Sequence, residues 1–284
     1  APQLSMAAMI GGSLANVVLE WVFIFPCQMG IFGAAFATGL APMISILIIS
    51  PHFIRKKNQF YLVPCKAEGK LFAGILSSGV PSLVTEVSSG VVIIVFNSII
   101  LNLEGNIGVA AYGVIANLSL VIVAIYTGIA QGIQPIVSRN YGRKDFGSVK
   151  ATLRYALVTM LVFSAAVYTV VCLGASQIAG IFNSEQNATL QSIASEGLRL
   201  YFIACPFAGF NVVISMYFTS TERPRPAHII SILRGFLLII PMAFLLSWLG
   251  KIRGVWCAFP ATELLVALIG LLFFVSGEKA KSRA

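Results

Sequence analysis

Eight apolar runs, each of roughly 20 residues or more, constrain what this chain can fold into. A helix of about 20 apolar residues is long enough to cross a hydrocarbon core of roughly 30 Å. The runs cover approximately residues 5–25, 29–53, 71–101, 107–137, 150–174, 191–219, 228–249 and 254–275. Stretches this long and without alternation favour helices over barrel strands, because backbone groups cannot stay unpaired in lipid. The sequence therefore predicts an all-α polytopic membrane protein with about eight transmembrane helices.

The composition supports a membrane protein over a nucleic-acid-binding one. Hydrophobic residues make up 58% of the chain and charged residues 10%, whereas about a quarter of the residues of a soluble domain are charged. The net charge of +9 could suggest nucleic acid, but the basic residues form short clusters between the apolar runs. We therefore expect membrane lipid, and no nucleic acid, as a partner.

The connections between the runs differ in positive charge. One alternate set carries Arg55, Lys56, Lys57, Lys66, Lys70, Arg139, Arg143, Lys144, Lys150, Arg223, Arg225, Lys279, Lys281 and Arg283. The other set carries only Lys251 and Arg253. By the positive-inside rule the first set is cytoplasmic, and eight spans put both ends of this chain there. The predicted location is a plasma membrane, crossed several times.

Motifs for enzymatic chemistry are missing from the sequence. The five cysteines are scattered without Cys-x-x-Cys spacing, and the two histidines, His52 and His228, are isolated. There is no glycine-rich nucleotide-binding loop. We therefore predict neither an enzyme nor a metal or cofactor site, and expect any work to draw on an ion gradient or on a partner.

Two segments far apart in the chain resemble each other. Residues 30–49 read GIFGAAFATGLAPMISILII and residues 251–270 read KIRGVWCAFPATELLVALIG. Gly33 aligns with Gly254 and Ala37 with Ala258, an offset of 221 residues (254 − 33). This offset is roughly the length of six membrane helices with their loops, which predicts a transporter built from two repeats.

The repeat also predicts the domain organisation. If the second repeat begins near Lys70, the first begins about 150 residues before Ala1, so we expect the first four helices to be absent from this chain. Residues 1–54 are then the last two helices of an N-terminal lobe and 55–70 a cytoplasmic loop between lobes. Residues 71–276 form a six-helix C-terminal lobe, followed by a cytoplasmic tail, 277–284.

Three stretches carry a family resemblance: GVPSLVTEVSSGVVIIVFN (79–97), GVAAYGVIANLSLVIVAIYTGIAQGIQPIVSRNYG (108–142) and GLRLYFIACPFAGFN (197–211). They resemble the seventh, eighth and tenth helices of bacterial multidrug and toxic compound extrusion (MATE) transporters. The resemblance runs from a fifth to a twelfth helix over essentially the whole chain. It implies a twelve-helix fold of two lobes that exports small organic cations in exchange for protons or sodium.

Glu86 is the first candidate for a functional residue. It lies in the middle of an apolar run, five residues after Pro81, and an ionisable group there is costly enough to indicate function. Asn97 follows after eleven residues, close to three helical turns, so both side chains project from nearly one face. Pro81 can kink the helix and leave a carbonyl group free for an ion or water. We predict that Glu86 and Asn97 form a cation- or proton-coupling site.

Two further considerations bear on Glu86. The MATE resemblance implies a glutamate at this place in the seventh helix that serves in coupling or cation binding. The alternative is a protonated Glu86 that only forms a hydrogen bond with a neighbouring helix.

The run 107–137 carries a stripe of polar and small residues. Its glutamines either line the substrate path or hold helices together, since amides in lipid serve both purposes. Gly128 and Gly132 form a small-residue pair that favours close helix packing, and Pro135 ends the regular helix. The predicted path- or gate-lining residues are Asn117, Gln131 and Gln134, together with Asn211 of the run 191–219.

Four other charged residues within the apolar runs are not predicted to take part in transport. Glu196 and Arg199 are three residues apart near the outer end of their helix, and are expected to form a local ion pair or to contact lipid headgroups. Arg234 is expected to extend toward the cytoplasmic end of its helix, and Glu263 has no evident partner in the sequence. Some sodium-coupled MATE members pair the seventh-helix glutamate with an aspartate in the tenth helix, where this chain offers Asn211. Protons are therefore favoured over sodium.

Three hypotheses remain open. The first is an antiporter that exports amphipathic cations. The second is a truncated product or subunit that depends on missing N-terminal helices or on a partner that supplies them. The third, a flippase for lipid-linked sugars, is disfavoured because such a cargo calls for a basic set of residues.

Overall fold

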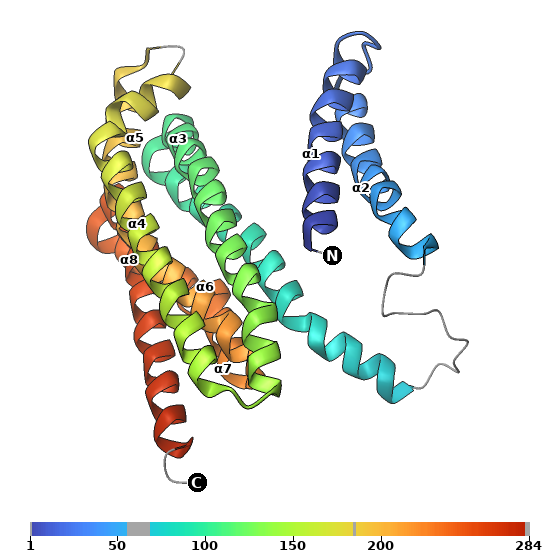
Figure 1. Cartoon of the computed structure of the whole chain (residues 1–284). Coiled ribbons are helices and arrows are strands. Elements are labelled where there is room, and N and C mark those ends of the chain that lie inside the picture. The colour runs from blue at the N-terminus through green and yellow to red at the C-terminus, as the bar shows by residue number, and fades with distance from the viewer. Residues whose placement is uncertain (1, 56–68, 184–185, 282–284) are drawn as a thin grey trace. The chain divides into compact units, whose positions relative to one another are not determined.

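Every element that the structure describes is a helix (Figure 1). The computed structural model describes residues 2–55, 69–183 and 186–281, without the side chains of residues 2, 70–82, 84–86 and 278–281. In chain order the elements are α1 (Pro2–Ile24), α2 (Gly30–Ile54), α3 (Gly69–Gly142), α4 (Phe146–Phe182), α5 (Ala188–Tyr201), the 3₁₀ turn η1 (Phe202–Ala204), α6 (Cys205–Ser220), α7 (Pro224–Ile232), the π-helical turn η2 (Leu233–Leu237) and α8 (Ile239–Lys281). The predicted all-α fold is confirmed for these residues.

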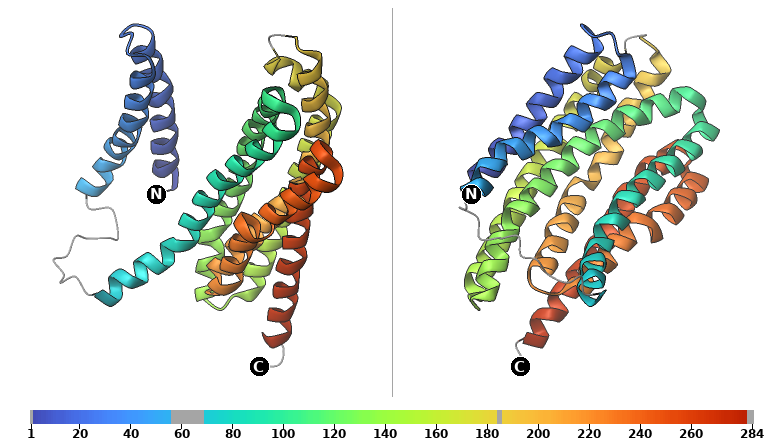
Figure 2. Two further views of the ribbon diagram at one scale, coloured as in Figure 1. Left: turned by 180° about the vertical axis from the view of Figure 1, so that it is seen from behind. Right: turned by 90° about the vertical axis from the view of Figure 1, so that its right-hand side faces the viewer.

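Six helical stretches of the described residues are long and apolar enough to cross a membrane. The two longest, residues 87–142 and 224–277, contain 56 and 54 residues. At 1.5 Å per residue each is about 80 Å long, far more than one crossing needs. Each contains a non-helical residue, Gly105 (φ 65°, ψ −158°) in α3 and Lys251 (φ 50°, ψ −132°) in α8. Both stretches therefore turn back on themselves, as Figure 2 shows for α3, and the predicted number of about eight crossings holds.

The chain divides into two compact units, residues 1–68 and 69–284. In the first, α1 and α2 form a helical hairpin; in the second, α3 to α8 pack around one hydrophobic core. Residues 56–68, most of the predicted loop 55–70, lie outside the described part of the chain. The assignment of 1–54 and 71–276 to two transporter lobes stays a prediction.

The two repeat segments have the same local construction. Each begins at a residue in the left-handed region, Gly30 with φ 55° and Lys251 with φ 50°, where the chain turns from one helix into the next. Three residues later, a Cβ atom at Gly33 or Gly254 would come within 3 Å of the end of the preceding helix. The alanines four residues further on are both completely buried. Small residues thus let each pair of helices approach closely beside its turn.

Aromatic rings and glycines together pack the core of the second unit. Tyr112 of α3 lies between Phe96 and Trp256, with ring centroids 5.6 Å and 6.2 Å apart. Gly197 of α5 faces Ile115 and the Trp256 ring, because a Cβ atom there would lie 2.5 Å from Ile115 Cδ1 and 3.0 Å from Trp256 Cε2. A glycine at this position therefore lets α5 approach the aromatic core closely.

Gly197→Ala should destabilise the chain by about 1–3 kcal/mol, because the added methyl group overpacks against a buried indole. Gly113→Ala is the matched control, since its Cβ atom would meet nothing within 4 Å. The control should leave stability unchanged or raise it by up to about 1 kcal/mol, as alanine favours helix. Thermal unfolding of the purified chain in detergent measures both, and equal midpoints would contradict this packing.

Asp145 closes the basic loop that precedes α4. Its Oδ2 accepts a hydrogen bond from the Ser148 hydroxyl at 2.6 Å, and its Oδ1 accepts one from the Ser148 N–H at 3.0 Å. The hydroxyl bond first, and the N–H bond second, stabilise the ionised carboxylate and lower the pKa of Asp145 below its ordinary value. The side chain is thus an N-cap whose hydrogen bonds favour the ionised carboxylate.

Asp145→Ala should destabilise α4 at neutral pH, and the difference from the parent chain should shrink in acid. Because the folded-state pKa is depressed, the stabilisation is complete above the ordinary aspartate pKa of about 3.9 and is lost as pH falls through the lower folded value. Asp145→Asn keeps a capping oxygen without a titrating charge, so its stability relative to Asp145→Ala should not vary over that window. Unfolding midpoints of the parent chain and both variants, measured between neutral pH and pH 3, test these two expectations.

Candidate functional site

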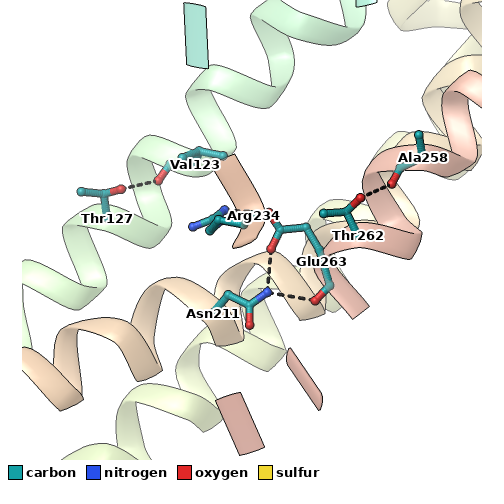
Figure 3. A network of polar contacts seen from close by, with 7 residues as sticks. All are labelled: Val123, Thr127, Asn211, Arg234, Ala258, Thr262 and Glu263. Atoms are coloured by element: carbon teal, nitrogen blue, oxygen red, sulfur yellow. Dashed lines mark hydrogen bonds and ion pairs between the residues drawn. The ribbon is translucent and has the colours of Figure 1, made fainter. Parts of the chain in front are cut away.

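Three polar side chains from different elements meet inside the second unit (Figure 3). Arg234 of η2 donates to Glu263 Oε1 of α8 from Nε at 3.1 Å and from Nη2 at 2.8 Å. Asn211 of α6 donates from Nδ2 to Glu263 Oε2 at 2.7 Å and to the Glu263 backbone oxygen at 2.9 Å. We call this set the Arg–Glu–Asn cluster. It ties three membrane segments together.

The local backbone of η2 places Arg234 in this cluster. Residues 233–237 form a π-helical turn, a rare geometry that often marks functional sites. Gly235 follows Arg234, and a Cβ atom there would overlap the side chain of Ser88 on α3. The glycine therefore lets η2 lie directly against α3.

The carboxylate of Glu263 is buried and its hydrogen bonds are satisfied. Its side chain is 2% exposed, whereas that of Arg234 is 21% exposed. An ion pair in the membrane interior is tolerated when each charge is matched and hydrogen-bonded, and removal of one partner leaves an uncompensated buried charge. The cluster thus holds Glu263 in a fixed position.

A pocket of about 190 Å³ borders the cluster. Arg234 and Glu263 form part of its wall. Its aromatic lining consists of Tyr112, Tyr201 and Phe259, and four serines, Ser88, Ser89, Ser119 and Ser231, add hydroxyl groups. A cavity that is mostly apolar and carries a few polar groups is typical of a small-molecule site.

The described side chains offer no group of three or more His, Cys, Asp or Glu residues arranged to hold a metal ion. Asn211 also has an amide oxygen that is buried and without a hydrogen-bond partner among the described groups. A single orphaned acceptor of this kind does not make a metal site, because a bound ion takes several ligands.

Of the predicted site residues, Asn211 alone lies in the cluster. Glu86 and Pro81 belong to α3, but their side chains lie outside the described residues. Asn97 is half-buried and is not among the residues that line the pocket. Their assignment to a coupling site and a helix kink stays a prediction.

The predicted stripe on α3 faces away from the core. The predicted path- or gate-lining residues Asn117, Gln131 and Gln134 are exposed. Pro135 is exposed too, and the expectation that it ends the helix is wrong, because α3 continues to Gly142. Cβ atoms built at Gly128 and Gly132 meet no atom of the described structure within 4 Å. The expectation that these two glycines mediate close helix packing is therefore wrong for the described part of the chain. The role of the glutamines stays a prediction.

Two expected charge assignments are wrong. Arg234 pairs with Glu263 instead of extending to the cytoplasmic end, because a buried carboxylate lies within its reach. Glu196 pairs with Arg253 of α8 at 2.6 Å, although Arg199 is closer in sequence. Sequence reasoning missed both pairs because their members lie on different helices. For Arg234 and Glu263, the available signal was one basic and one acidic residue in separate apolar runs.

Comparisons with known proteins agree on one family. The MatE family matches residues 81–245. Multidrug export protein MepA of Staphylococcus saprophyticus is 25% identical over 277 residues, which cover 96% of this chain and 60% of that protein. MepA of Staphylococcus aureus is 25% identical over 283 residues with the same coverage. The chain thus spans about 60% of the length of these curated relatives.

Solved structures show the same fold. The chain is similar to a multidrug resistance MATE family transporter of the MOP superfamily in an outward-facing conformation, with a TM-score of 0.88 and 22% identity over 98% of this chain and 63% of that one. It is also similar to a MOP superfamily transporter of Pyrococcus furiosus, for which a reverse polarity of the binding pocket suggests a different function. That likeness has a TM-score of 0.82 and 23% identity over 94% of this chain and 61% of that one.

Arg234→Ala should destabilise the chain by about 3–5 kcal/mol, because Glu263 then stays buried without its counter-charge. The double variant Arg234→Met/Glu263→Met removes both charges and should recover most of that loss. Unfolding of the purified chain by titration with a denaturing detergent compares the two. If the double variant is less stable than Arg234→Ala, the pair is not coupled as described.

Proposed function

The chain belongs to the MatE family, and from this premise we propose that it forms part of a secondary active antiporter that exports organic cations in exchange for protons or sodium. The family match over residues 81–245 is the observation that carries the proposal. The relatives named as multidrug export proteins support it, because they align with nearly the whole chain. The apolar helices are those of a multi-pass membrane protein.

Glu86 is the residue proposed to couple ion and substrate movement. It precedes Ser88 and Ser89, two residues that line the pocket, by two and three positions along α3. A carboxyl group in a membrane helix can exchange a proton for a cation. Asn97, eleven residues further on, is proposed to assist by offering an amide oxygen.

Protons are the proposed coupling ion. A sodium site needs several oxygen ligands, preferably with an unpaired carboxylate. Within the described part of the second unit, the buried carboxylate of Glu263 is already bound to Arg234, and the Asn211 amide nitrogen is committed to the same group. These contacts support a proton on Glu86 over sodium shared between helices.

Substrate enclosure requires more than the helices of this chain. Alternating access moves one repeat against another around a central site, and this chain spans about 60% of its curated relatives. We propose that additional helices, in the same protein or in a partner, complete the transporter. In this arrangement the basic connections, such as those with Arg139, Arg143 and Lys144, face the cytoplasm of a plasma membrane.

Glu86→Gln should abolish gradient-driven efflux of ethidium, with a loss of tenfold or more, because glutamine cannot exchange a proton. The assay follows dye efflux from cells that produce the chain joined to the N-terminal helices of the Staphylococcus saprophyticus relative. Glu196→Gln is the matched control, since that carboxylate is bound to Arg253 away from the pocket. Unchanged efflux in Glu86→Gln would refute the coupling role.

A further inference from the structure

The two charged residues of α4 are both basic and lie near the start of the helix. Lys150 and Arg154 are four residues apart, so their side chains lie on one face, and α4 contains no aspartate or glutamate. The buried residues of α4, such as Leu153 and Met160, project from the other side of the helix. The exposed Lys150 and Arg154 therefore face away from the core of the second unit.

An open groove of about 540 Å³ lies on this exposed face of α4. Its lining consists of Lys150, Ala151, Arg154, Tyr155 and Val158. Along the helix, the two basic groups are followed by Tyr155, which is 74% exposed, and then by Val158 and Val162, which are exposed as well. This order matches the depth profile of a membrane leaflet, in which basic groups meet headgroups, aromatic rings lie at the interface and aliphatic groups contact acyl chains.

Arg154 carries a charge that no described residue neutralises. It forms no hydrogen bond or ion pair with another residue of the described ranges. Asp145, the acidic residue nearest to it in sequence, uses both carboxylate oxygens on Ser148. Lys150 adds a second positive charge one turn closer to the start of α4. Because a guanidinium group presents a planar fork that matches phosphate oxygens, the groove favours a phosphate-bearing anion.

The length of α4 favours a lipid phosphate over a dissolved one. The helix has 37 residues and is about 55 Å long at 1.5 Å per residue, whereas the hydrocarbon core is roughly 30 Å thick. Its first turns therefore extend into the headgroup region, and Arg154 lies about 12 Å from the start of the helix. A lipid can place its phosphate at Arg154 and an acyl chain along Val158, whereas a dissolved ion would use only the basic end of the groove.

We propose that this groove binds an anionic phospholipid of the cytoplasmic leaflet, with the phosphate held by Arg154 beside Lys150. The inference goes beyond the proposed transport function. It rests on the membrane-spanning helices and on the proposed cytoplasmic side of the basic connections, and requires neither Glu86 nor a substrate. Phosphatidylglycerol fits better than phosphatidylcholine, because the choline ammonium would lie beside two basic side chains in a groove without an acidic lining residue.

Competition between two lipids tests the proposal. The purified chain in dodecyl maltoside is incubated with equal amounts of phosphatidylglycerol and phosphatidylcholine that carry the same acyl chains, and native mass spectrometry counts the lipids that stay bound. Phosphatidylglycerol should be retained at least about fivefold more often, the factor that one basic residue contributes at an anionic membrane surface. A large excess of glycerophosphoglycerol, the headgroup without acyl chains, should leave this ratio unchanged. The measurement needs no ion gradient, so a failure of Glu86-dependent efflux would leave it intact.

Three variants locate the bound lipid. Arg154→Gln should lower the retention ratio about fivefold, whereas Arg154→Lys keeps the charge and should preserve most of it. Arg225→Gln is the matched control, since it removes an exposed arginine from the same predicted side of the membrane outside the groove, and it should leave the ratio unchanged. Equal retention of the two lipids by the parent chain, displacement of phosphatidylglycerol by the soluble headgroup, or equal effects of Arg154→Gln and Arg225→Gln would overturn the proposal.

Discussion

Inside a membrane-spanning bundle, each member of an ion pair needs a counter-charge and hydrogen-bond partners. The second unit supplies both to Glu263. The carboxylate of Glu263 is 2% exposed and receives donors from two other helical elements. Arg234 could not shift far along its helix without leaving a buried charge unpaired, and a shift of Asn211 would remove the hydrogen bond to Glu263 Oε2. The relative positions of α6, η2 and α8 therefore depend on this one group, as does the pocket that Arg234 and Glu263 border.

Much of the fold could be predicted because its determinants are local. Runs of about 20 apolar residues indicate membrane helices whatever their neighbours are. The turn at Gly105 lies in the short polar interval between two such runs, and the turn at Lys251 likewise separates the last two. The repeated glycines, Gly33 and Gly254, could also be found, since their spacing along the chain reflects a hairpin built twice in the same way.

The candidate site could be predicted only in part because its partners are distant in sequence. Arg234 and Glu263 are 29 residues apart, and Asn211 and Glu263 are 52 apart. Their meeting depends on how whole helices pack, which no short pattern encodes. The polar stripe on α3 was visible as a pattern, but the same pattern fits a cavity wall and a packing face. Within the described part of the second unit, Gly128 and Gly132 make no close contact with another helix.

The π-helical turn η2 has a consequence for the phase of its helix. A π-helical turn spreads its hydrogen bonds over one more residue than an α-helical turn, and each residue of an α-helix corresponds to about 100° of rotation. Side chains after Leu237 are therefore rotated by about that angle from where an unbroken helix from Pro224 would put them. The segment before the turn and the segment after it can present apolar faces to different neighbours. A single extra residue is enough to give one membrane crossing two independent orientations, and Arg234 lies where they change.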